Sequence, residues 1–84
     1  MNKKIVIIYD NYLRRYVDKE VSILEAANIP VELKHINEVT LMIPNRLPVF
    51  ALEKQGKYSN FLSGKFNDDR VLEWARKFDW SQLD

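Results

Sequence analysis

The sequence predicts an α/β domain whose four-stranded mixed sheet is built around one buried strand. The first observation is the run Ile5–Tyr9, which is apolar without interruption and rich in β-branched residues, as is typical of a strand covered on both faces. The second is the helical periodicity of the residues that follow. The third is a second predicted strand, Val31–Ile36, directly after Pro30, with Val31 and Leu33 on one face and Glu32 and Lys34 on the other. Strand, helix and strand at this spacing predict two parallel strands joined by a right-handed crossover.

The helix is expected to run from Asp10 or Asn11, either of which can cap its start, to about Ala27. Asn28 suits a left-handed C-cap, and Pro30 prevents the helix from continuing. One set of residues recurs at helical spacing and predicts a buried stripe: Leu13, Val17, Val21, Leu24 and Ala27. The charged residues are expected mostly on the solvated faces: Arg14, Arg15, Asp18, Lys19, Glu20 and Glu25.

The second half of the chain predicts a β-hairpin and a final helix. Val49–Lys54 and Lys57–Leu62 form the two expected strands, and Gly56 supplies the positive φ of the tight turn between them. The outer strand is a candidate open edge of the sheet. The run Asn67-Asp68-Asp69 predicts the start of the helix. Trp74 is expected at the border of the buried stripe of this helix, and Trp80 is expected to fold back over the core. The stripe consists of Val71, Leu72, Ala75 and Phe78.

Length and composition restrict the function. The 84 residues are expected to form one domain over residues 1–84. A net charge of +1 argues against a dedicated nucleic-acid binder. No apolar run has the roughly 20 residues of a membrane span, and the apolar run after Met1-Asn2-Lys3-Lys4 is too short for a signal peptide, so a cytoplasmic protein is expected. The absence of cysteine and the single histidine exclude thiolate chemistry and a His-rich metal site, and no cofactor is expected.

Four stretches carry a resemblance to a known family. They are Tyr9–Val17, Ile23–Val31, Leu47-Pro48-Val49 and Ser63-Gly64. In this order and spacing they resemble the strand end and Cys-x-x-Cys loop, the helix end and second strand, the cis-proline motif and the glycine turn of the glutaredoxin-type thioredoxin fold. The resemblance covers nearly the whole chain and implies the order β-α-β, a short connection, then β-β-α.

Two departures from the family pattern decide what the resemblance implies for activity. The connection between Ile36 and Pro48 is shorter than is usual in the family, so its second helix is expected to be reduced or missing, with at most one helical turn near residues 38–42. Arg14 and Val17 stand where the two cysteines should be. Dithiol exchange requires a thiolate, so the domain is expected to be redox-inactive and not an enzyme.

The resemblance also places a candidate binding site at the former active-site corner. It implies a cis peptide bond before Pro48, which would leave the Leu47 backbone facing a peptide or glutathione groove. Arginines close to a helix N-terminus favour anions, and the tyrosines beside them add a composition enriched at interfaces. The candidate residues are Tyr12, Arg14, Arg15, Tyr16, Arg46, Leu47 and Pro48. In the alternative interpretation, the arginines point into water and pair with Asp10 or Asp18.

The sequence leaves several functions open. The first is a protein-interaction module that uses this corner. The alternative is a binder of a small molecule, glutathione-like or anionic. Catalysis by other residues has little support, because the only candidate pair is Asp10 and His35 at two strand ends, and one such pair does not make a catalytic mechanism. His35 is expected as a surface or hydrogen-bonded residue. A small phage or mobile-element protein that modifies a host complex also fits. A protein partner is expected, with no membrane association, and with the chain as a monomer or weak homodimer.

Overall fold

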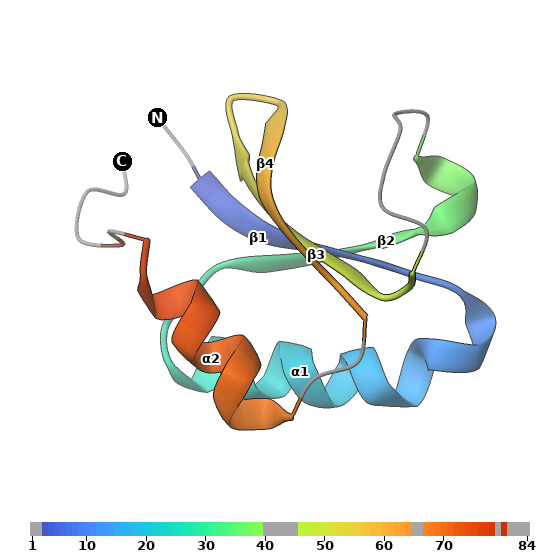
Figure 1. Ribbon diagram of the computed structural model, residues 1–84, viewed down its shortest axis with the longest axis horizontal. Helices are drawn as coiled ribbons and strands as arrows, with labels where there is room; N and C mark the ends of the chain where they lie inside the picture. The colour runs from blue at the N-terminus through green and yellow to red at the C-terminus, as the bar shows by residue number, and fades with distance from the viewer. Residues whose placement is uncertain (1–2, 40–45, 65–66, 79, 81–84) are drawn as a thin grey trace.

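The computed structural model describes residues 3–39, 46–64, 67–78 and 80. These residues form four strands, two α-helices and two short 3-10 turns (Figure 1). In chain order they are β1 (Lys3–Tyr9), η1 (Asn11–Leu13), α1 (Arg14–Ala26), β2 (Val31–His35), η2 (Ile36–Glu38), β3 (Val49–Lys54), β4 (Lys57–Ser63) and α2 (Asp68–Arg76). The order predicted from the sequence is therefore confirmed for the described residues.

The strands form one mixed sheet in the order β2-β1-β3-β4. β1 pairs in parallel with β2 and antiparallel with β3, and β4 returns antiparallel beside β3. Both helices lie on the same face of this sheet (Figure 1). The predicted parallel pair, hairpin and four-stranded mixed sheet are all present, and β1 lies at the interior of the sheet, as its unbroken apolar run indicates.

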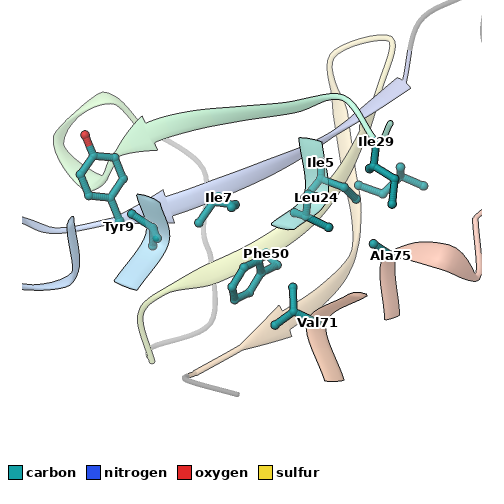
Figure 2. Close-up of a cluster of buried hydrophobic side chains, with 10 residues drawn as sticks. Ile5, Ile7, Tyr9, Leu24, Ile29, Phe50, Val71 and Ala75 are labelled. Carbon is teal, nitrogen blue, oxygen red and sulfur yellow. The ribbon is translucent and has the colours of Figure 1, made fainter. Parts of the chain in front are cut away.

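The two faces of β1 serve two separate apolar clusters. Ile5, Ile7 and Tyr9 face the helices and pack with Phe50 of β3. Figure 2 shows this helix-side cluster, which α1 completes with Leu24 and α2 with Val71 and Ala75. Val6 and Ile8 face the other way and are fully buried with Val49 beneath a cover of partly buried side chains: Ile36, Val39, Leu47 and Tyr58. Full burial of each large aliphatic side chain stabilises the fold by about 1.5–3 kcal/mol.

The sequence explains both ends of the first helix. The Asp10 side chain accepts a hydrogen bond from the Tyr12 N–H at 3.1 Å, so Asp10 caps η1, which leads into α1. At the other end Asn28 adopts φ 63°, and the Asn28 and Ile29 N–H groups donate to the carbonyls of Glu25 and Leu24. This is a Schellman C-cap, and Asn28 is the predicted left-handed residue.

One prediction for α1 is wrong. Glu20 was expected on a solvated face, but its side chain is fully buried, like Val17 and Leu24 on the same helix. The physical reason is its position, since residue 20 lies three residues after Val17 and four before Leu24 and therefore shares their face. The stripe consequently carries a carboxylate inside the fold. The other expected members of the stripe, Leu13, Val21 and Ala27, are partly buried against the helix-side cluster.

The hairpin and the last helix follow the sequence closely. Gln55 and Gly56 have φ of 55° and 80°, which is the pattern of a two-residue type I′ turn. Asn67 caps α2 by accepting from the Arg70 N–H at 2.9 Å. Trp80 folds back over the core as expected, and its Nε1–H donates to the carbonyl of Ala75 at 2.8 Å. The helical turn predicted over residues 38–42 lies mostly outside the described residues, since residues 40–45 are not described. A 3-10 turn that was not predicted, η2, covers Ile36–Glu38.

The sheet face opposite the helices carries a charged network across three strands. The Lys4 ammonium pairs with Glu32 of β2 and lies 3.7 Å from a Glu53 carboxylate oxygen of β3. The hydrogen bond from Lys4 lowers the pKa of Glu32 below its ordinary 4.5. The hydrogen bond to the Tyr58 oxygen likewise raises the pKa of Lys34. Because Lys34 and Tyr58 belong to the two edge strands, their contact reaches across β1 and β3.

The lowered pKa of Glu32 gives a pH-dependent contribution to stability. A carboxyl whose pKa is lower in the folded state stabilises the fold above its unfolded pKa, and the contribution is lost as the pH falls through the folded value. Glu32→Gln is therefore expected to reduce the free energy of unfolding by about 0.5 kcal/mol at pH 7, after allowance for solvent screening of a partly exposed pair. Urea unfolding at pH 7 and pH 3 should show that this difference is smaller at pH 3. An equal difference at both values would contradict it, and Glu25→Gln on an exposed position of α1 is the control.

Candidate functional site

Three strand ends meet at one edge of the sheet and create the candidate site. Tyr9 at the end of β1 is paired with His35 at the end of β2, and Ile8 is paired with Val49 at the start of β3. In Figure 1 this edge lies on the right, where β1 continues into η1 and β2 into η2. The register therefore brings the segment after Tyr9 and the segment before Val49 to the same edge. We call the seven predicted residues of these segments, Tyr12, Arg14, Arg15, Tyr16, Arg46, Leu47 and Pro48, the corner.

Tyr12 is the most exposed large apolar side chain among the described residues, with 96% of its surface accessible. Its backbone is nevertheless fixed, because its N–H donates to the Asp10 carboxylate and it lies within η1. Tyrosine has few rotatable bonds, so a fixed backbone presents its ring at a small entropic cost on binding. The ring is thus an accessible contact on a hydrogen-bonded backbone just after the end of β1.

Arg14 has an exposed side chain that is engaged by its neighbours. Its Nε donates to the Asp18 carboxylate at 3.0 Å, and its Nη1 donates to the Tyr9 hydroxyl at 2.8 Å. The guanidinium carbon also lies 5.4 Å from the centre of the Tyr9 ring. The nearby Asp18 charge, followed by Tyr9, raises the pKa of Arg14. The alternative interpretation, pairing with Asp18, therefore describes Arg14, and its charge is partly balanced within the fold.

The remaining corner residues divide into exposed and packed side chains. Arg15 and Arg46 are exposed, and the Arg46 carbonyl accepts a hydrogen bond from the Ser63 hydroxyl at 2.6 Å. Tyr16 is half-buried against the helix-side cluster. Leu47 packs against the cluster on the opposite face, and Pro48 is fully buried. The Leu47–Pro48 peptide bond is cis, which is the geometry that the resemblance implies. The exposed side chains of the corner are thus Tyr12, Arg14, Arg15 and Arg46, and of these Arg14 is engaged by Asp18 and Tyr9.

His35 makes four contacts at the end of β2, two within η2 and two with residues at the end of β1. Its Nδ1 accepts from the Asn37 N–H at 3.2 Å, and its Nε2 lies 3.0 Å from the Asn11 Oδ1. The Glu38 carboxylate accepts from the His35 N–H at 2.9 Å, which completes a capping box around η2. The ring also meets Tyr9 edge to face at 5.3 Å. His35 is therefore a satisfied residue, as expected, and its partner is Asn11 instead of Asp10.

Sequence reasoning did not anticipate the link between His35 and Asn11. Nothing in the spacing of the two residues indicates contact, since it depends on the register of β1 with β2. The capping box could have been recognised in the sequence, because His35 precedes Glu38 by three residues, as in the Ser/Thr-x-x-Glu pattern. With the Tyr9 contacts, this connects Arg14, Tyr9, His35 and Asn11 into one cluster at the ends of β1 and β2.

The corner contains no thiol, because the chain has no cysteine. Val17, which the resemblance aligns with a cysteine, is fully buried. Within the described ranges no group of three or more His, Asp or Glu side chains is arranged to hold a metal ion. None of the helices described is long and apolar enough to cross a bilayer.

Searches with protein-family models, curated proteins and solved structures gave no match to this chain. The geometry of the corner is that of an exposed tyrosine and three exposed arginines, one of them paired with Asp18, around a hydrogen-bonded edge of the sheet.

Proposed function

We propose that the chain is a redox-inactive, thioredoxin-like domain that binds a protein partner through Tyr12, Arg15 and Arg46. The strand order β2-β1-β3-β4, with a parallel β1–β2 pair and an antiparallel hairpin, is compatible with that fold. Because the chain has no cysteine, a function of such a domain has to come from its surface. A fold alone does not assign a function, and the features that point to one here are the exposed side chains of the corner.

The observation that carries the proposal is the exposure of Tyr12 on a fixed backbone. A tyrosine ring that is 96% accessible gains nothing from the core of its own domain, and placing it in a partner's pocket removes apolar surface from water. Tyr and Arg are the residue types that most often dominate binding energy at interfaces. Arg15 and Arg46 are exposed charges at the same edge, so they can supply the polar surroundings of such an anchor.

The proposal predicts that the double variant Tyr12→Ala/Arg15→Glu loses its partner without losing its fold. Truncation of an interface anchor costs about 2 kcal/mol or more, which is roughly a 30-fold loss of affinity. Both side chains are exposed, so the stability should change by no more than about 0.5 kcal/mol. Arg14 is left unchanged, because its reversal would break the contacts with Asp18 and Tyr9.

The measurement is affinity capture from the native cell with three forms side by side, followed by titration calorimetry with the purified partner. Lys19→Glu, an exposed charge reversal further along α1, is the matched control and should retain the partner. A partner retained equally by the double variant would place the interface elsewhere. Capture of no partner by the wild-type chain would contradict a protein-binding function.

A further inference from the structure

Three lysines form a row across the sheet at the end opposite the corner. Lys3 of β1 is paired directly with Lys54 of β3, and Lys54 is paired directly with Lys57 of β4. Neighbouring strands lie about 4.7–4.9 Å apart, and directly paired residues point to the same face. Figure 1 shows the start of β1 and the hairpin tip on the same side of the molecule. We call Lys3, Lys54 and Lys57 the lysine row.

The row lies on the helix side of the sheet and has an aromatic neighbour. Side chains alternate along a strand, so Lys3 shares the face of Ile5, and Lys54 shares the face of Leu52, which both belong to the helix-side cluster. The Lys3 ammonium lies 5.6 Å from the centre of the Trp80 ring. Lys54 and Lys57 are exposed. The row therefore borders the surface that Trp80 covers.

The lysine row differs from the neighbouring Lys4 in its described charge partners. Lys4, one residue along and on the opposite face, pairs with Glu32 and lies near Glu53. Within the described residues, none of the three lysines of the row has a carboxylate within ion-pair distance. Like charges placed directly opposite each other on paired strands destabilise a sheet, so the arrangement lowers the stability of the unbound domain.

Protection of a sheet edge explains only one member of the row. Lysines on edge strands discourage pairing with another chain, and Lys57 lies on the edge strand β4. That edge is also distorted, because the β3–β4 register shifts opposite Ala51 where Asn60 adopts φ 56°. Lys3 and Lys54 lie on β1 and β3, which are interior strands. Their charges need a different explanation.

We propose that the lysine row is a second interaction surface that binds an acidic segment of a protein partner. The positive charge of the row is complementary to carboxylates, and lysine acts as a point charge that makes no demand on planar geometry. A protein is favoured over a nucleic acid because the row is short and the whole chain carries a net charge of only +1. The surface lies at the other end of β1 from the corner, so it does not depend on the function proposed for Tyr12.

Titration with poly-L-glutamate, followed by amide chemical shifts, tests this surface. Shift changes are expected at Lys3, Lys54, Lys57 and the Trp80 indole. Lys54→Glu/Lys57→Glu should weaken the binding by about tenfold or more, since two charge contacts become repulsive. The same variant should unfold at a temperature close to that of the wild type, because the repulsion between Lys3 and residue 54 becomes an attraction while residues 54 and 57 remain a like-charge pair. This second measurement separates loss of binding from loss of folding.

The control is Lys19→Glu/Arg70→Glu, which changes the net charge by the same amount on the exposed surfaces of the two helices. It should bind poly-L-glutamate as the wild type does. Equal weakening in the control would show that the attraction is non-specific and would overturn the proposal, as would an absence of shifts at the row. Tighter binding of single-stranded oligo-dT through the same three residues would overturn the assignment to an acidic protein in favour of a nucleic acid.

Discussion

Phe50→Ala is expected to lower the free energy of unfolding by about 3–5 kcal/mol. Phe50 is fully buried at the centre of the sheet, where it packs in the helix-side cluster with Ile5, Ile7 and Val71 and meets Trp74 edge to face at 6.2 Å. Its removal leaves a cavity that strands on both sides of β3 prevent from collapsing. Since the total free energy of unfolding of a native domain is about 5–15 kcal/mol, this single change should remove a large part of the stability.

Urea and thermal unfolding followed by circular dichroism measure this effect, and a decrease of more than about 12 °C in the unfolding temperature is expected. Phe61→Ala in the same hairpin is the matched control, because Phe61 is 39% exposed on the edge strand β4. It should cost less than about 1 kcal/mol. Similar losses for the two phenylalanines would contradict the placement of the core beneath β3.

The second large effect is expected at Glu20. Glu20→Lys should lower the free energy of unfolding by about 3–5 kcal/mol, because it replaces a fully buried carboxylate by a longer side chain of opposite charge. Nothing in the surrounding Val17 and Leu24 stripe can balance an ammonium. Urea unfolding of the purified variant is the measurement, and a poorly soluble variant would itself report the loss of the fold.

Glu25→Lys provides the comparison, since Glu25 is on the same helix with an exposed side chain. It should change the stability by no more than about 0.5 kcal/mol. If Glu20→Lys and Glu25→Lys behaved alike, the Glu20 side chain would have to reach solvent, and the packing of α1 against the sheet and α2 would need revision.

The sequence was sufficient to predict the elements because their signals are local. The unbroken run Ile5–Tyr9 indicated an interior strand, Asn28 before Pro30 indicated the left-handed end of α1, and Gly56 indicated the tight turn. Each of these depends on backbone sterics or burial that neighbouring residues determine. The strand boundaries agree with the structure to within one residue for β2 and β4.

Glu20 shows where sequence reasoning fails. Helical periodicity placed this position on the buried stripe, but glutamate is almost never fully buried, and the residue type was given more weight than the position. The bulge at Asn60 was missed for a related reason, since asparagine tolerates the left-handed region anywhere in a chain and nothing local marks which asparagine will use it.

The corner was predicted only in part because its side chains are arranged by long-range packing. The sequence identified Tyr12, Arg15 and Arg46, which are exposed. It left the pairing of Arg14 with Asp18 as one of two interpretations, and it did not indicate the Arg14 contact with Tyr9 or that Leu47 is half-buried against the opposite face. The packing of Leu47 depends on the register of β1 with β3, which no short stretch of sequence determines.

The position of β1 between β2 and β3 also determines when the chain can fold during its synthesis. β1, α1 and β2 leave the ribosome first, but the pairs that join Lys3 to Lys54 and Ile8 to Val49 form only after the hairpin has emerged. Until then one edge of β1, together with the apolar side chains of Val6 and Ile8, has no partner from β3 and is a surface on which other nascent chains can pair. Such non-local pairing is slow relative to helix formation. The nascent domain is therefore expected to be most vulnerable to aggregation, and most dependent on chaperones, in the interval between the emergence of β2 and that of β3.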